Sequence, residues 1–248
     1  MHPKQTLIFG LRPVIEALEN GKEFEKVFVQ KNLLGPLSKE LEFLLRNTDT
    51  PRQYVPIEKL NRITGKNHQG VVAYLSEITY YKIENLLPPV FEKGKTPLLV
   101  MLDEITDVRN MGAIIRTAEC AGADAVLVPS KGSALINAEA MKASAGALNI
   151  MPVCRETNLK DTLNFLKSSG LQVVACTEKS PALYNSIDFS LPTVLIFGSE
   201  GSGISPEILK MSDVQIRIPL QGKIDSLNVS VSAGIILYEA LRQRTASK

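Results

Sequence analysis

The stretch from Thr193 to Ala240 constrains the fold of this chain more than any other part of it. Thr193–Phe197 is a short β-branched and apolar run, and a glycine- and serine-rich turn joins it to a helix-start signal at Ser205–Glu207. A second run, Val214–Leu220, leads through another polar turn to a helix that Asn228 opens. In an open α/β sheet, ligands bind at the carboxyl ends of strands, and helix N-termini favour anions. We therefore expect a small charged ligand to bind here.

Strands and helices also alternate through the rest of the chain. Residues 1–78 hold four short apolar runs separated by three helical patterns, which is enough for a small α/β domain. Residues 79–96 are rich in proline, tyrosine and charge, so we expect an interdomain linker with one short helix. Residues 97–248 predict a larger α/β domain whose parallel sheet is covered on both faces. Its expected strands are 98–102, 125–128, 171–175, 193–197 and 214–218.

Composition limits what the chain can do. The 248 residues have a net charge of only +2, so binding to nucleic acid must depend on local patches. Three isolated cysteines and two histidines argue against a zinc site and against a disulfide scaffold, which fits a reducing compartment. The N-terminus lacks the apolar core of a signal peptide, and no apolar run approaches the ~18 residues of a membrane span. We expect a cytoplasmic protein without a membrane partner.

Residues 107–116 form the first group of candidate functional residues. Asn110 is a good N-cap for a helix that begins at Met111. Arg116 then falls in the second turn, on a segment made otherwise of alanine, isoleucine and methionine. An arginine in such a place either extends its charge to solvent or recognises an anion, and the residues alone favour neither.

The loop Gly198–Gly203 is the second candidate. Its glycine spacing is not the dinucleotide fingerprint, and it lacks the lysine of a phosphate-binding loop. A glycine-rich loop is most often a tight turn between strand and helix. Glu200 would repel a phosphate, so the loop suits a cationic ligand, a ribose or an amine instead.

Two further polar stretches stand out. Residues 226–232 hold three serines and Asn228, which is more than a helix cap requires. Residues 65–70, preceded by Arg62, form a cationic turn that could meet RNA, although a solvated loop is the commoner explanation. His68 and His2 lie in different parts of the chain from the serines, so no Ser/His/Asp triad is indicated.

Three of these segments, in this order, resemble the motifs of the SpoU/TrmH family of RNA ribose 2′-O-methyltransferases, part of the SPOUT superfamily. They are NMGAIIR (Asn110–Arg116), IFGSEGSGIS (Ile196–Ser205) and IPLQGKIDSLNVSVSAGI (Ile218–Ile235). The stretches LIFGLRPVIEAL and NHQGVVA are similar to the substrate-binding domain of the bacterial 23S rRNA guanosine-2′-O-methyltransferase subgroup. The resemblance covers nearly the whole chain. Val108 stands where many relatives have proline, which affects only the stiffness of the loop before Asn110.

The resemblance implies an α/β-knot (trefoil-knotted) methyltransferase domain with a parallel sheet, preceded by a small ribosomal-protein-like RNA-binding domain. It implies S-adenosyl-L-methionine (S-adenosylmethionine) as cofactor and a homodimer in which one subunit reaches the other's site. Knots are rare, and no periodicity indicates one. The residues that the resemblance assigns to the cofactor are Thr177, Gly198, Gly201, Ile218 and Leu227.

The same resemblance implies attack by a ribose 2′-oxygen on the sulfonium methyl group. Arg116 would have the key role, with Asn110, Glu200 and Asn228 orienting the site. Because a guanidinium stays protonated at neutral pH, we expect electrostatic stabilisation rather than simple general-base catalysis. The residues expected to contact RNA are Arg12, Arg62, Lys66 and His68.

Several functions remain open at this point. The leading hypothesis is methylation of a guanosine in large-subunit rRNA. A tRNA ribose methylase and an adenosine-modifying resistance methylase are alternatives within the same class. A catalytically silent RNA-binding assembly factor is the alternative from another class, although the chain retains the four expected catalytic residues. The glycine spacing disfavours a dehydrogenase-type enzyme.

Overall fold

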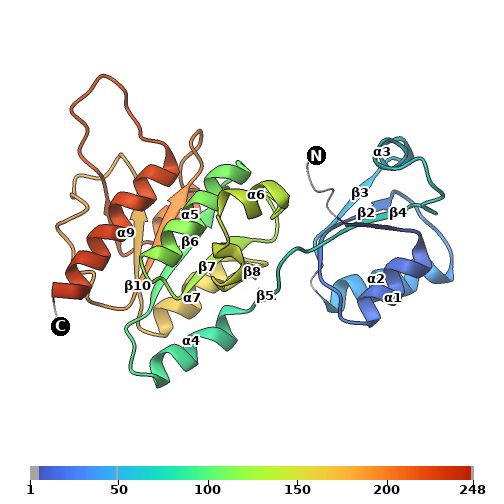
Figure 1. The fold of residues 1–248 in the computed structure, drawn as a ribbon, viewed down its shortest axis with the longest axis horizontal. Helices are drawn as coiled ribbons and strands as arrows, with labels where there is room; N and C mark the ends of the chain where they lie inside the picture. Colours follow the sequence, from blue (N-terminus) through green and yellow to red (C-terminus); the bar gives the residue numbers. More distant parts are fainter. Residues whose placement is uncertain (1–5, 49, 247–248) are drawn as a thin grey trace. The chain divides into compact units, whose positions relative to one another are not determined.

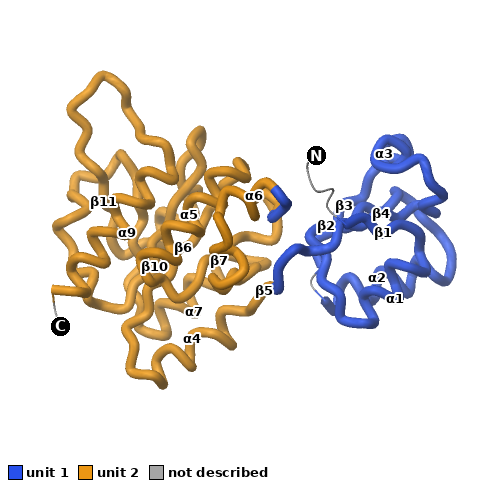
Figure 2. The backbone as a smooth tube through the Cα atoms, in the orientation of Figure 1, with its two compact units in different colours: residues 1–79, 136–138 blue, residues 80–135, 139–248 orange. Residues whose placement is uncertain are grey.

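The computed structural model describes residues 6–48 and 50–246, and the chain forms two compact units. Unit 1 comprises Met1–Thr79 with Ile136–Ala138, and unit 2 comprises Tyr80–Leu135 with Glu139–Lys248 (Figure 2). Each unit has its own sheet and its own hydrophobic core. The two units are therefore described separately.

Unit 1 is built on a mixed four-stranded sheet with the order β1-β4-β2-β3. β4 runs antiparallel to β1 and β2, whereas β2 and β3 are parallel. Its elements are β1 (Leu7–Phe9), α1 (Leu11–Glu19), β2 (Phe24–Gln30), α2 (Pro36–Asn47), β3 (Arg52–Val55), α3 (Ile57–Ile63) and β4 (Val71–Leu75).

The two faces of this sheet are covered by different helices (Figure 1). Successive side chains of a strand point to opposite faces. Val27 and Val29 of β2 accordingly pack with α1 and α2, while Phe28 between them packs with Leu60 of α3. α3 has only seven residues, so it covers less of its face than the two longer helices cover of theirs.

Unit 2 holds a seven-stranded sheet with the order β11-β9-β10-β6-β7-β8-β5, and all its strand pairs are parallel. Its strands are β5 (Tyr80–Tyr81), β6 (Leu98–Asp103), β7 (Ala125–Pro129), β8 (Val153–Glu156), β9 (Gln172–Cys176), β10 (Thr193–Gly198) and β11 (Val214–Ile216). Its helices are α4 (Ile83–Glu92), α5 (Val108–Cys120), α6 (Ala138–Ala143), η1 (Ala147–Asn149), α7 (Leu159–Ser168), α8 (Pro206–Met211) and α9 (Val229–Ala246).

The parallel sheet is covered on both faces, as expected from the alternation of strands and helices. α4, α7 and α8 bury apolar side chains against one face, where Leu99, Leu127, Val173 and Ile196 belong to the same core. α5 and α9 pack against each other on the other face (Figure 1). All five strands expected in this region are present, within two residues at each end.

Most of the expected linker, residues 79–96, belongs to unit 2, which corrects that expectation. β5 pairs in parallel with β8 at the edge of the sheet. Ile83 and Leu87 of α4 are fully buried, and the backbone N–H of Ile83 donates to Glu156 Oε1 at 3.2 Å. The physical reason is that the prolines of this stretch, Pro88 and Pro89, lie inside α4 rather than ending it.

The strand order brings the polar loops of unit 2 together. Gly198 at the end of β10 is in register with Asp103 of β6, and Phe197 is in register with Cys176 of β9. Ile216, the last residue of β11, is also in register with Cys176. Because parallel strands end at the same edge, the loops after these strands meet there. In the part of the chain that the structure describes, no helix is long and apolar enough to span a membrane.

Candidate cofactor and catalytic site

A cleft of about 270 Å³ lies at the carboxyl ends of β9 and β10, and a smaller hollow of about 80 Å³ adjoins it beside β11. The two share Cys176, Thr177, Glu178, Ser226, Leu227 and Ser232 in their walls. Thr177, Gly198, Gly201 and Leu227 line the larger hollow, and Ile218 lines the smaller. All five residues that the resemblance assigns to the cofactor therefore lie around one connected space.

The glycine-rich loop closes on itself to form one wall of this cleft. Ser199 and Gly203 exchange two backbone hydrogen bonds of 3.1 and 2.9 Å, and Gly203 has a φ of +71°. A Cβ atom on Gly198 would lie 2.1 Å from the carbonyl carbon of Gly203. Glycine is therefore required at Gly198 because the returning loop occupies the space of a side chain.

Asp103, which sequence reasoning did not single out, anchors the far end of this loop. Its buried carboxylate accepts a 2.7 Å hydrogen bond from the backbone N–H of Ser205, the residue that precedes α8. An aspartate at the end of a wholly apolar strand was the available signal. Asp103 thus fixes where the loop ends and the helix begins.

Three of the four expected catalytic residues lie in one hydrogen-bonded cluster. Glu200 Oε1 accepts from Asn110 Nδ2 at 3.0 Å and from Asn228 Nδ2 at 2.6 Å. The Asn228 amide also lies 3.0 Å from Asn110 Oδ1, to which it donates. The cluster joins the start of α5, the glycine-rich loop and the start of α9. These segments are far apart in the sequence and meet only in the fold.

Asn110 is not the N-cap of α5, contrary to the expectation from sequence. Asp107 is the cap, because its Oδ1 accepts from the backbone N–H groups of Arg109 and Asn110 at 2.8 and 2.9 Å. The helix begins at Val108, three residues earlier than expected. This arrangement leaves the Asn110 side chain available to bond Glu200.

Asn228 has two roles at the start of α9. Its Oδ1 accepts from the backbone N–H of Ser230 at 3.0 Å and from the Ser230 hydroxyl, as a helix cap does. Its Nδ2 donates to Glu200 at the same time. The polar run at 226–232 thus exceeds a simple cap because its asparagine connects the helix to the cluster.

Arg116, the fourth expected catalytic residue, does not join this cluster. Its side chain is exposed on α5, and within residues 6–48 and 50–246 it has no hydrogen bond or ion pair. It does not line the cleft. A single copy of the chain therefore presents Arg116 to the solvent.

The walls of the cleft combine apolar, acidic and basic groups, and the basic ones are Lys179 and, in the smaller hollow, Arg217. Phe197, Ile204 and Leu227 supply apolar surface, and carboxylates of Glu178 and Glu200 line the same space. Burial raises the pKa of the Cys176 thiol well above the usual range, which disfavours the thiolate form that a nucleophile needs. Among the described residues no group of three or more His, Cys, Asp or Glu side chains could hold a metal ion. The cleft suits a ligand that combines an apolar part with charged groups of both signs.

In unit 1, Arg12, Arg62 and Lys66 are exposed, but His68 is buried. His68 Nδ1 accepts from the Gly70 backbone N–H at 3.0 Å, and its Nε2 lies 2.8 Å from Asn61 Oδ1. Both ring nitrogens are used inside the unit, so His68 shapes the 65–70 turn, and its expected contact with RNA stays a prediction.

Gln69 links that turn to the start of α1. Gly10 precedes α1 and has no side chain to cap it, and Gln69 Oε1 accepts from the Leu11 N–H at 3.2 Å instead. Gln69 has a φ of +50°, which is unusual for a residue with a side chain. The turn and Arg12 are thereby held in one region of unit 1.

A doubly covered parallel sheet with an apolar and charged cleft at its carboxyl edge is the arrangement in which α/β enzymes bind nucleoside-type cofactors. The comparisons with known proteins agree with this class. Residues 97–238 match the model of the SpoU rRNA Methylase family, and residues 7–81 match the model for RNA 2′-O ribose methyltransferase substrate binding. The chain belongs to the SpoU rRNA methylase family.

Relatives resemble the chain to different extents. YacO of Bacillus subtilis, whose name assigns it to the TrmH family of tRNA/rRNA methyltransferases, is 33% identical over 98% of both chains. The AdoMet-bound rRNA methyltransferase of Sinorhizobium meliloti is 28% identical, with a TM-score of 0.61 over 95% of this chain and 86% of that one. The TrmH/SpoU tRNA modifying enzyme of A. aeolicus is 33% identical, with a TM-score of 0.57, and covers 66% of this chain and 85% of its own.

Proposed function

We propose that this SpoU-family methyltransferase uses S-adenosylmethionine to methylate a ribose 2′-hydroxyl. The proposed target is the ribose of a guanosine in large-subunit rRNA. The observation that carries the proposal is the cleft itself, which brings all five expected cofactor residues and the Asn110–Glu200–Asn228 cluster to the carboxyl ends of β6, β9 and β10.

The residues of the cleft fit S-adenosylmethionine. Leu227, Ile216 and Ile236 offer an apolar surface for a purine ring, and the glycine-rich loop presents backbone groups without side chains. Glu178 and Glu200 line the same cleft, so their carboxylates would offer a favourable environment for the positive charge of the ligand. When bound, S-adenosylmethionine supplies an electrophilic methyl group on a sulfonium.

The polar cluster would orient the substrate at this methyl group. Glu200 is held by two amides, and its Oε2 has no hydrogen bond among the described residues, so it is free to accept from a ribose hydroxyl. Holding an acceptor and a nucleophile in fixed geometry supplies much of the rate increase of such a transfer.

Arg116 would act in the site of a second copy of the chain. Its side chain is exposed and has no hydrogen bond to the cluster of its own subunit among the described residues. The resemblance nevertheless gives Arg116 the key role. α9, which packs beside α5, also exposes Val231 and Tyr238, whose side chains are about half accessible. A homodimer that packs through α5 and α9 would bury the side chains of Val231 and Tyr238. It would also bring Arg116 to the partner's cleft.

Ribosomal RNA is the better candidate substrate because the similarity to the rRNA enzyme extends over both units. The S. meliloti rRNA methyltransferase covers 95% of this chain, whereas the A. aeolicus tRNA enzyme covers 66%. A tRNA substrate is the second candidate, since YacO is named for both RNAs. An assembly factor without activity is disfavoured by the intact polar cluster.

Mapping 2′-O-methyl groups in total RNA with and without the gene tests this proposal. Loss of one guanosine mark in large-subunit rRNA is the expected result. A mark lost from tRNA would contradict the assignment of rRNA as the substrate. If no mark were lost and calorimetry showed no S-adenosylmethionine binding, the proposed methyltransferase activity would be contradicted.

A further inference from the structure

One face of the unit 1 sheet carries ordered lysines over aromatic rings. The ammonium groups of Lys26 and Lys59 lie 5.2 and 5.0 Å from the centroid of the Phe28 ring. Phe28 in turn meets Tyr74 edge to face, with 6.2 Å between ring centroids. Lys66 lies 5.4 Å from the centroid of the Phe9 ring.

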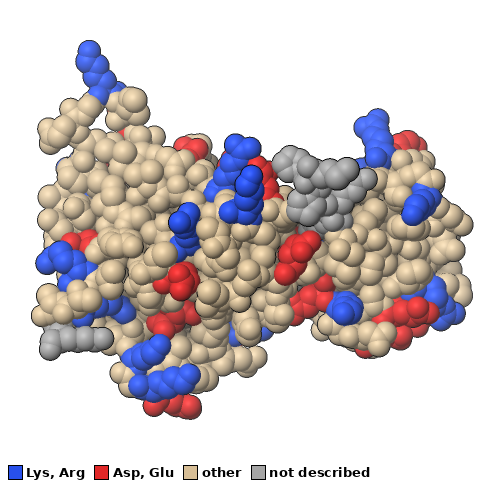
Figure 3. Space-filling model, viewed as in Figure 1, with Lys and Arg blue, Asp and Glu red and all other residues tan. Residues whose placement is uncertain are grey.

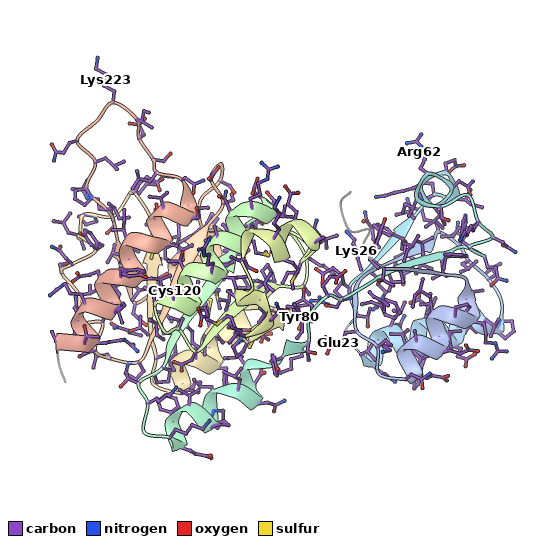
Figure 4. The ribbon with its side chains drawn as sticks, in the orientation of Figure 1. Glu23, Lys26, Arg62, Tyr80, Cys120 and Lys223 are labelled. Atoms are coloured by element: carbon purple, nitrogen blue, oxygen red, sulfur yellow. The ribbon has the colours of Figure 1, made fainter. Side chains whose placement is uncertain are left out.

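These groups share a face because of strand register. Phe9 and Phe28 both pair with Val72 of the central strand β4, so the two rings lie in one row across the sheet. Lys26 precedes Phe28 by two residues on β2 and therefore points to the same side. Lys59 belongs to α3, which packs on this face, and Arg62 follows it by one helical turn, standing outward in Figure 4. Figure 3 shows basic side chains projecting over α3.

The positive charges on this face are not neutralised by the described residues. None of Lys26, Lys59, Arg62 and Lys66 forms an ion pair there. Glu25 lies at a register irregularity of β2, is buried, and accepts from the Ile136 N–H at 2.8 Å. Glu58 is the one carboxylate on α3.

Lys26 and Lys59 repel each other. Because they share one ring, their nitrogens are at most about 10 Å apart, which is within about one Debye length at moderate salt. Burial, followed by the charge of Lys59, lowers the pKa of Lys26. A protein that keeps two like charges this close gains from an anion that contacts both.

We infer that Lys26 and Lys59, held over Phe28 and flanked by Arg62 and Lys66, form a binding surface for the phosphodiester backbone of RNA. The inference rests on the proposed function, which makes RNA the polyanion. The rings fix the ammonium groups by cation–π contact and so reduce the freedom that each lysine loses on binding. No base edge is read, so the surface positions the RNA without selecting its sequence.

Salt-dependent binding of the full chain to large-subunit rRNA and to tRNA tests this surface. The double variant K26Q/K59Q should bind both RNAs about tenfold more weakly near 100 mM salt, and its log–log salt slope should fall by about 1.4 to 1.8. The matched control K22Q/K39Q removes two exposed lysines from the turn after α1 and from α2, and its slope should stay unchanged. K26R/K59R keeps both charges and should restore binding.

The outcomes separate this surface from the proposed function. Equal losses in K26Q/K59Q and K22Q/K39Q would overturn the inference, since net charge alone would then explain binding. A wild-type chain that methylates RNA while K26Q/K59Q binds normally would overturn the inference and leave the function standing. A wild-type chain that binds no RNA would overturn both. Equal urea midpoints for the three variants and the wild type would show that folding is unaffected.

Discussion

Glu200 accepts a hydrogen bond of 2.6 Å from the side-chain amide of Asn228, and this contact joins the glycine-rich loop to the first turn of the last helix. Neither residue is fixed by its own segment alone. Glu200 is exposed on a loop, and Asn228 precedes α9. The contact therefore exists only when both segments are docked against the sheet.

Asn228→Ser separates the two roles of Asn228. Serine still caps a helix, so the free energy of unfolding should change by less than about 1 kcal/mol. The shorter side chain cannot reach Glu200, and methyl transfer should fall about 100-fold because the acceptor is no longer positioned. Single-turnover transfer and urea unfolding measure the two effects. Ser230→Ala is the control, since it alters the cap but not the contact to Glu200, and an equal loss of transfer in both variants would contradict the assignment.

Gly198→Ala should disrupt the cofactor cleft. The new Cβ would lie 2.1 Å from backbone atoms of the returning loop, and such overpacking costs about 1–3 kcal/mol or more. We expect a lower urea midpoint and no S-adenosylmethionine binding in calorimetry. Gly201→Ala is the matched control, because no atom lies within 4 Å of its Cβ position. A Gly198→Ala chain as stable as Gly201→Ala would show that the loop is not closed as described.

Glu156→Gln should change how stability depends on pH. Burial, ahead of other causes, raises the pKa of Glu156 above its usual range. The protonated form is therefore favoured in the folded chain, and this contribution is present below about pH 4.3 and is lost as pH rises through the folded pKa. Glutamine stays neutral and can still accept from the Ile83 N–H. The variant should gain stability relative to the wild type between acid and neutral pH, and a constant difference in urea midpoints would contradict this.

Mixing two inactive variants tests whether Arg116 serves the partner's site. Glu200→Ala and Arg116→Ala should each be nearly inactive alone. In mixed dimers of a two-fold symmetric enzyme, one site then holds both intact residues, so about a quarter of wild-type activity should return. If Arg116 acted within its own subunit, no activity would return. Sedimentation of the wild type at micromolar concentration checks that the dimer exists.

The sequence predicts the strands of unit 2 well where apolar β-branched runs end in polar turns. β8 is not predicted from the sequence because only two of its four residues are apolar. The other two are Arg155 and Glu156, so the strand lacks a continuous apolar run. The misplaced start of α5 has a similar cause. Asp107 and Asn110 are both good caps three residues apart, and only the observed hydrogen bonds decide between them.

The site is predictable as a set of residues but not as a geometry. Motif order indicates Asn110, Glu200 and Asn228, yet no local pattern indicates that β9 lies between β10 and β11 or that three loops share one edge. For His68 the sequence indicates a solvated polar turn. Only the structure shows that its ring lies against Asn61 inside the unit. The knot that the resemblance implies stays a prediction, as does the use of Arg116 across a dimer.

Because α9 and the Asn228 that precedes it follow β6, β9 and β10 in the chain, the site has a built-in order of completion. The ribosome releases β6, β9 and β10 well before α9, so a nascent chain has most of its sheet while the cleft still lacks one wall. Under the proposed function, such a chain would hold RNA through unit 1 without modifying it. Methyl transfer would begin only once α9 has docked on α5, so a chain cut before α9 should be inert rather than indiscriminate.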